Sequence, residues 1–138
     1  MYLLDTNACI ALINASSPRL LVRFREHMPS EFVMSSVVIA ELLFGAQKSA
    51  RAADNTRVVR QFVSPFVHLP FVHLPFDDTC AIEYARLRAE LERMGTPIGA
   101  NDLMIAATAL AHDVVLITRN TREFARVPNL RYENWQDA

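Results

Sequence analysis

Three acidic residues in this sequence have no basic residue nearby that could neutralise them. Asp5 directly follows the apolar run at residues 2–4. Around Glu41 and Asp102, every position three or four residues away holds an apolar residue or glycine. Unpaired carboxylates are costly inside a protein, and several together repel one another unless a cation binds them. If the fold brings these three together, we expect them to hold a hard divalent cation, Mg²⁺ or Mn²⁺.

Most other acids on the predicted helices do have a basic neighbour. The acids with an arginine three or four residues away are Glu26, Asp54, Glu83, Glu90, Glu92 and Glu123. Such pairs are typical of solvated helix faces. A structural explanation also exists for two of the unpaired acids, because Asp5 and Asp102 could each stabilise the start of a helix. Glu41 is harder to explain, since a glutamate facing the core from mid-helix is rarely left unpaired.

Short apolar segments that alternate with helical segments predict an α/β domain. Strands are expected at 2–4, 31–36, 114–118 and near 130–134, and helices at 6–14, 18–28, 37–47, 49–63, 79–94, 101–113 and 121–124. We expect Ser35 or Ser36 to cap one of these helices and Asn101 to cap another. The alternation favours a parallel sheet covered by helices. The carboxyl ends of such strands meet at one edge, where we expect the three unpaired acids to gather.

The pentapeptide FVHLP occurs twice in succession, at residues 66–70 and 71–75. Because five is an odd number, two copies in one strand would present opposite faces, and Pro70 would interrupt the hydrogen bonding of that strand. We therefore expect one copy to form a strand, with the second copy the better candidate, and the other to be loop or helix end. A metal site formed by His68 and His73 is the weaker alternative.

The bulk composition indicates a single globular domain over residues 1–138. The chain is 51% hydrophobic and 21% charged, and its length is enough for one core. It shows no signal-peptide pattern, and its longest nearly apolar stretch, 103–111, is too short to cross a bilayer, so no membrane association is expected. Cys9 and Cys80 lie outside any Cys or His ligand spacing. We expect two reduced, buried thiols in a cytoplasmic protein.

The net charge of −1 by itself disfavours nucleic-acid binding, which usually goes with a basic excess. Divalent cations at an acidic site would reverse the local field and let a phosphate backbone approach. Neither GxxxxGK[ST] nor GxGxxG occurs in the sequence, which disfavours nucleotide-driven transfer. Metal-assisted cleavage of a phosphodiester is the leading hypothesis. A phosphoaspartate enzyme using Asp5 is the weaker alternative, because Asn7 stands where such phosphatases need a second aspartate.

Four segments of the chain resemble successive motifs of the PIN-domain ribonucleases. They are LLDTNACIAL, SSVVIAELLFGA, GTPIGANDLMIAATAL and ITRNTREFARVPNLRYENW, in the expected order and at the expected spacing. The likeness runs from Met1 to about Trp135 and is closest to the VapC toxins of bacterial toxin–antitoxin pairs. It implies a three-layer α/β/α fold with a five-stranded, mainly parallel sheet. It also implies an endoribonuclease that depends on Mg²⁺ or Mn²⁺.

The resemblance implies roles for residues that match the family's motifs. Asp5, Glu41 and Asp102 match the acids that bind the metal, with Glu41 as a ligand or as the group that positions the attacking water. Thr6 and Thr118 match polar positions that help to orient the metal or its water. Which acid acts as general base stays open, because a bound metal can itself lower the pKa of water.

The family often carries a fourth acid just after the strand that corresponds to residues 114–118 here. This chain has a different residue at that position. Asn120 occupies the matching position and can hydrogen-bond a metal-bound water, but it supplies no charge. Glu123, one helical turn later, is the other candidate. Arg119 and Arg126 lie close to it in the sequence, which argues against Glu123 as a ligand.

The resemblance further implies an RNA substrate, a homodimer and a cognate antitoxin, with the antitoxin blocking the acids in a larger toxin–antitoxin assembly. The segment at 36–46 is more apolar than one core face requires, so part of it could bind a partner helix, or it could be a fully buried core helix. Two alternatives remain for the function: a PIN nuclease that processes RNA, and a catalytically silent PIN-type binding module.

Overall fold

Within residues 1–67 and 73–137, which the computed structural model describes, five short strands form one parallel sheet in the order β3-β2-β1-β4-β5. The strands are β1 (Tyr2–Leu4), β2 (Phe32–Ser35), β3 (His73–Leu74), β4 (Val115–Ile117) and β5 (Tyr132–Glu133). Each pairing between neighbouring strands is parallel. This confirms the predicted α/β class.

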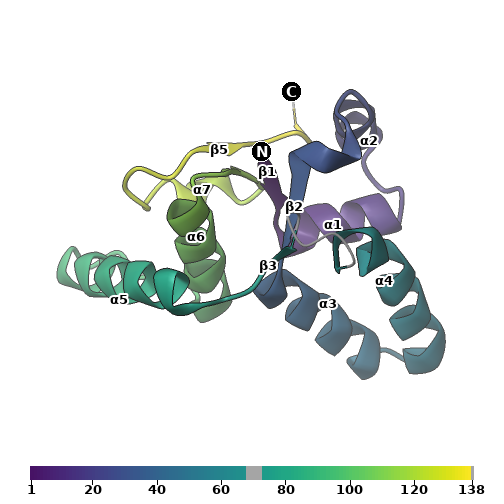
Figure 1. Ribbon diagram of the computed structural model, residues 1–138, viewed down its shortest axis with the longest axis horizontal. Helices are drawn as coiled ribbons and strands as arrows, with labels where there is room; N and C mark the ends of the chain where they lie inside the picture. Colours follow the sequence, from purple (N-terminus) through teal and green to yellow (C-terminus); the bar gives the residue numbers. More distant parts are fainter. Residues whose placement is uncertain (68–72, 138) are drawn as a thin grey trace.

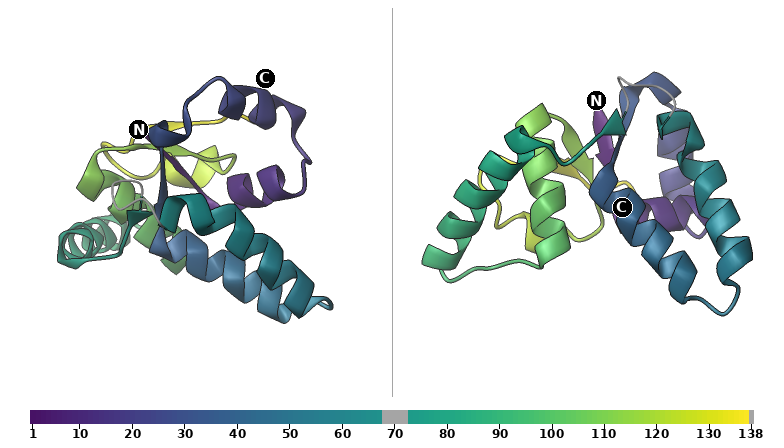
Figure 2. Two further views of the ribbon diagram at one scale, coloured as in Figure 1. Left: turned by 45° about the vertical axis from the view of Figure 1, so that its right-hand side comes forward. Right: turned by 60° about the horizontal axis from the view of Figure 1, so that its bottom comes forward.

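Helices cover both faces of the sheet and complete a three-layer α/β/α arrangement (Figure 1). On one side lie α1 (Thr6–Ile13), α2 (Pro18–Arg25), α3 (Ser36–Lys48) and α4 (Ala52–Val67), with the 3-10 helix η1 (Pro29–Glu31) leading into β2. On the other side lie α5 (Asp78–Arg93), α6 (Ala100–His112) and the short α7 (Thr121–Phe124). Figure 2 shows α5 and α6 packed together on their side and α3 and α4 packed together on theirs.

The strand order reverses between β1 and β4, at the centre of the sheet. The chain passes from β1 to β2 and β3 in one direction and then returns to β4 on the far side of β1. Asp5 follows β1 and Thr118 follows β4, and the N–H of Asp5 donates to the carbonyl of Ile117 at 3.0 Å. In parallel sheets ligands bind outside the carboxyl ends of the strands at such a switch point. The topology therefore places Asp5 and Thr118 where a binding site is expected.

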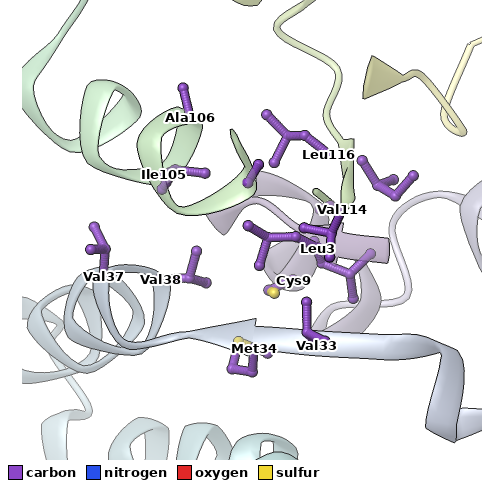
Figure 3. Close-up of a cluster of buried hydrophobic side chains, with 14 of the residues drawn as sticks. Leu3, Cys9, Val33, Met34, Val37, Val38, Ile105, Ala106, Val114 and Leu116 are labelled. Atoms are coloured by element: carbon purple, nitrogen blue, oxygen red, sulfur yellow. The ribbon is translucent and has the colours of Figure 1, made fainter. Parts of the chain in front are cut away.

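The core forms where the central strands meet α3 and α6 (Figure 3). Leu3, Val33 and Leu116 of the strands are at most 1% exposed, and Ile105 of α6 is fully buried. Val38 of α3 is also fully buried, and α3 and α6 contact one another directly. Burial of this kind contributes roughly 1.5–3 kcal/mol per large aliphatic side chain. The same contact brings two of the predicted acids, one on each helix, toward a common edge.

The apolar segment at 36–46 is only partly buried. Val37, Val38 and Leu42 of α3 lie in the core, whereas Phe44 on the same helix is 67% exposed. Each of the two interpretations of this segment thus describes one face of α3.

Most helix boundaries lie within a few residues of the prediction, but one predicted cap is wrong. Ser35 caps α3, its Oγ accepting the N–H of Val37 at 3.1 Å. Asn101 does not cap α6, which begins at Ala100 after the N-cap residue Gly99. The physical reason is that the Asn101 amide donates to Glu41 of α3, so it serves a contact between helices rather than its own helix end.

The second FVHLP copy supplies a strand, as predicted. This strand, β3, pairs with β2. The first copy begins inside the last turn of α4, which ends at Val67. His68 lies outside the described residues, and His73 Nε2 lies 3.2 Å from the hydroxyl of Ser36. Across residues 1–67 and 73–137, every helix is too short or too polar to span a bilayer.

Candidate metal-binding site

Asp5 is the most deeply buried acid of the site. It is 4% exposed and caps α1, its Oδ1 accepting the N–H of Ala8 at 2.8 Å. Burial raises the pKa of the Asp5 carboxyl above its ordinary value, and the charge of Glu41 adds to this effect. Hydrogen bonds from the Thr118 hydroxyl and from Ala8 oppose it. Asp5 is therefore both the helix cap and a buried carboxylate at the switch point.

Glu41 is held in place from two other helices. It lies in the middle of α3, and the hydroxyl of Thr6, the first residue of α1, donates to its Oε1. The Asn101 amide of α6 donates to Oε2 at 3.0 Å. Both carboxylate oxygens are thus oriented by neutral donors. Neither these donors nor the residues three or four positions away in the sequence offer a positive charge to Glu41.

Asp102 lies in the first turn of α6 and faces other carboxylates. Partial burial, the charge of Glu123 and a hydrogen bond with Glu123 raise its pKa to about 7, and the charges of Glu41 and Asp5 contribute further. A carboxyl group with such a pKa shares a proton with its neighbour near neutral pH. The structure thus brings the three predicted acids within electrostatic reach of one another, from β1, α3 and α6.

Glu123 lies in this group as well, and only one of its two sequence-neighbouring arginines acts on it. Arg119 pairs with Asp137 at 3.4 Å, whereas Arg126 donates to the carbonyl of Pro97 at 3.1 Å and its charge lowers the pKa of Glu123. Partial burial would raise the pKa of Glu123, but hydrogen bonds from the Gly99 N–H, the Asn120 amide and Asp102 hold it below its ordinary value. The reason is that α7 turns Glu123 inward, toward the start of α6.

Asn120 and Thr118 form a link between the two ends of the acidic group. The Asn120 amide Nδ2 donates to Glu123 Oε2 at 2.6 Å, and the Asn120 N–H donates to the Thr118 hydroxyl at 2.9 Å. Thr118 is 1% exposed, and its side chain also bonds to Asp5. Both residues therefore position carboxylates, Asn120 that of Glu123 and Thr118 that of Asp5.

Apart from Glu123, the acids predicted to lie on solvated helix faces pair as expected. The pairs are Arg23–Glu26, Arg57–Asp54, Arg86–Glu83, Arg86–Glu90 and Arg88–Glu92. The contrast isolates Asp5, Glu41, Asp102 and Glu123 as carboxylates that face one another. An all-carboxylate donor set in which the pKa values of Asp5 and Asp102 are raised fits a hard divalent cation, whose charge would offset the repulsion. Softer metals prefer imidazole or thiolate ligands, and these acids offer neither.

A groove of about 590 Å³ runs beside the acids along α3. Its lining residues are Thr6, Ser36, Val37, Ala40, Glu41, Phe44, Asn101 and Met104. The wall is mainly apolar and includes Glu41 and its hydrogen-bond partner Asn101. A ligand in this groove would contact apolar side chains and the acidic group together.

Comparison with known proteins identifies related molecules along nearly the whole chain. The family model for the PIN domain matches residues 2–130. The chain is 39% identical to the tRNA(fMet)-specific endonuclease VapC of Salmonella typhimurium over 134 residues, 97% of each protein. It is 38% identical to the Ribonuclease VapC2 of Rickettsia felis, covering 98% of each.

The fold comparison gives the same relatives. The crystal structure of DNA-bound VapBC from Salmonella typhimurium matches with a TM-score of 0.87 and 39% identity, over 97% of each chain. The site described above therefore lies in a fold that solved proteins share from end to end.

Proposed function

Because this chain belongs to the PIN-domain family, and within it to the VapC ribonucleases, we propose that it is an Mg²⁺- or Mn²⁺-dependent endoribonuclease toxin. PIN nucleases generally depend on a divalent metal. We further propose that Asp5, Glu41 and Asp102 hold the ion. The supporting observation is that partial burial and the charge of Glu123, with further contributions from Glu41 and Asp5, raise the pKa of Asp102 to about 7.

A bound divalent ion supplies a Lewis acid and lowers the pKa of the attacking water. The chain's own residues then orient the carboxylates. The Thr118 hydroxyl and the Ala8 N–H fix Asp5, and the Thr6 hydroxyl and the Asn101 amide fix Glu41. Partners of this kind typically affect metal affinity or activity by about 10–100-fold when removed.

We propose that Glu123, and not Asn120, supplies the fourth acid. Glu123 bonds directly with Asp102, whereas the Asn120 amide donates to Glu123 and so acts as a positioning group. Glu123 thereby supplies the negative charge that Asn120 lacks. It does so from one helical turn after the position where the family often carries the fourth acid.

The proposed substrate is RNA, cut by hydrolysis of a phosphodiester. The relative from Salmonella typhimurium is named as an endonuclease specific for tRNA(fMet), so this RNA is the first substrate to test. Phosphate contacts give affinity without sequence information, so the target must be identified by experiment rather than by counting arginines.

We also propose that the chain pairs with a cognate antitoxin and forms a homodimer within that assembly. The solved relatives are VapBC toxin–antitoxin complexes. The mainly apolar groove along α3 includes Glu41 in its wall, so a partner segment seated there would cover apolar surface and Glu41 together.

The decisive experiment compares the wild-type chain with Asp5→Asn and Asp102→Asn. Asparagine keeps a side-chain oxygen to cap α1 and removes the charge that holds a cation. We expect the wild type to arrest growth when expressed and to cleave RNA in the presence of Mg²⁺ or Mn²⁺. Each variant should lose at least about 100-fold in cleavage rate.

A matched control is Glu26→Gln, which neutralises an acid in an exposed pair with Arg23 at the end of α2. It should retain wild-type activity, and circular dichroism should show all four proteins folded. Equal cleavage by wild type, Asp5→Asn and Asp102→Asn would overturn the nuclease assignment. Cleavage of RNA without growth arrest would favour the alternative role in RNA processing, and folded protein with neither property would favour a silent binding module.

A further inference from the structure

A second group of potential metal ligands lies away from the acidic site, where the beginning of α5 meets the end of α6. Asp77, Cys80 and His112 each offer one ligand atom, and these three atoms lie within 4.8 Å of one another. We propose that this group is a binding site for a borderline-soft transition-metal ion of the Zn²⁺ type, which ties α5 to α6.

The helix pair explains why residues so far apart in the sequence meet. Asp77 is the N-cap of α5 and Cys80 lies in its first turn, whereas His112 is the last residue of α6. The two helices pack against one another as an antiparallel pair, so the beginning of α5 lies beside the end of α6 (Figure 2). Cys80 and His112 are 32 residues apart, so the group does not match a short sequence motif of metal ligands.

The hydrogen bonding of the group leaves ligand atoms available. Among the described residues, the buried Nε2 of His112 has no hydrogen-bond partner. Buried polar atoms are nearly always satisfied, so an unpartnered imidazole nitrogen calls for an explanation such as an ion. The Cys80 thiol makes a long contact to the carbonyl of Pro75, with sulfur and oxygen 3.7 Å apart, and has hydrogen bonds with the side chains of Thr108 and Asp77. A thiol is a weak hydrogen-bonding group, so a metal–sulfur bond would replace only weak contacts.

The donor set selects the class of metal. Thiolate sulfur and imidazole nitrogen favour Zn²⁺ and its neighbours, whereas Mg²⁺ and Mn²⁺ prefer oxygen ligands. Three protein ligands leave a fourth tetrahedral position for water, and the exposed Asp77 places that position toward solvent. Binding releases the thiol proton, because a coordinated cysteine is deprotonated by the metal.

The position of the group separates it from the acidic site. His112 ends the helix whose first turn carries Asp102, ten residues or roughly 15 Å along the axis. The ion would thus act as a brace that fixes α6 from its far end. This inference does not depend on the nuclease activity.

The test uses the full-length chain freed of metal with a chelator and titrated with Co²⁺ as a spectroscopic probe. We expect one equivalent to produce a thiolate-to-cobalt charge-transfer band that Zn²⁺ abolishes and Mg²⁺ does not. Zn²⁺ should also raise the midpoint of thermal unfolding. Cys80→Ser and His112→Gln should each weaken Co²⁺ binding at least about tenfold.

Matched controls separate this site from the rest of the protein. Cys9→Ala removes the other cysteine, which lies in the core, and should keep the band. Asp102→Asn should also keep it, because that change affects only the acidic site. If Cys80→Ser fails to fold, His112→Gln decides the outcome. Absence of the band in the wild type, or its persistence in both ligand variants, would overturn the proposal.

Discussion

Asp102 and Glu123 behave as one titrating unit. Their carboxyl groups share a hydrogen bond, with the pKa of Asp102 raised to about 7 and that of Glu123 lowered by its own donors. Near neutral pH the pair therefore carries one proton that a divalent cation would displace. The two carboxylates repel one another in the folded protein, and a bound cation would relieve this repulsion.

Asp102→Asn should stabilise the metal-free protein at alkaline pH. The folded-state pKa of Asp102 lies above its unfolded value of 3.8, so its favourable contribution is full below about pH 4 and is lost as the pH rises through about 7. In chelator, wild-type stability should therefore fall between about pH 5 and about pH 8. The variant should be more stable at the higher pH by about 1–2 kcal/mol, a value reduced for the partial exposure of the side chain.

Urea unfolding at both pH values, with and without Mg²⁺, measures this difference. Mg²⁺ should stabilise the wild type at the higher pH and have much less effect on Asp102→Asn. Parallel pH profiles for the two proteins would show that Asp102 is not held protonated by its neighbours.

At the scale of elements, the contact between α3 and α6 decides whether a site exists. The strands are only two to four residues long, so the helices carry most of the positioning. Val38 on α3 and Ile105 on α6 are both fully buried near the sheet, one turn from Glu41 and Asp102 respectively. The Asn101 amide then joins the two helices through Glu41. Packing in the core thus sets the distance between two carboxylates at its rim.

Ile105→Ala should destabilise the protein and weaken the acidic site together. Removing most of a fully buried isoleucine side chain costs about 2–5 kcal/mol and lets α6 shift against α3. Chemical denaturation measures the loss of stability, and Mg²⁺ titration at a temperature where the variant is folded measures the site. Ile82→Ala on α5 is the matched control: that side chain is 70% exposed, and we expect a change within about 0.5 kcal/mol. Equal effects of the two substitutions would contradict the assignment of Ile105 to the core.

At the scale of the whole molecule, apolar surface and negative charge lie side by side at one edge. Phe44 is 67% exposed and lines the same groove as Glu41. Large exposed aromatic side chains in such a position are typical of a surface that a partner covers. A partner segment bound in the groove can therefore bury its apolar side chains there and block access to the acids at the same time.

Phe44→Glu should release the proposed toxin from its antitoxin without harming the enzyme. The side chain is exposed, so folding and RNA cleavage by the free chain should stay close to wild type. Loss of an aromatic anchor typically costs about 2 kcal/mol or more in binding, and the new charge adds to this loss. Co-expression with the cognate antitoxin should therefore rescue growth of the wild-type strain but not of the variant strain. Equal rescue would place the antitoxin elsewhere.

Local sequence patterns were enough to predict the fold class, the order of the elements and the three candidate metal-binding acids. Apolar strands and helical spacing are local properties, so β1, α3 and β4 could be read directly, and Glu41 drew attention because its helical neighbours are all apolar or glycine. The choice between FVHLP copies also followed from local rules, since strand alternation and proline act over a few residues.

Contacts between elements became clear only from the three-dimensional arrangement. Arg119 turns away from Glu123 to pair with Asp137, and Asn101 donates to Glu41 instead of capping its own helix. In the same way Cys80 and His112 become neighbours because two helices run antiparallel. Spacing along the chain reports contacts within one helix or strand, whereas contacts between elements depend on packing directions that the local pattern does not contain.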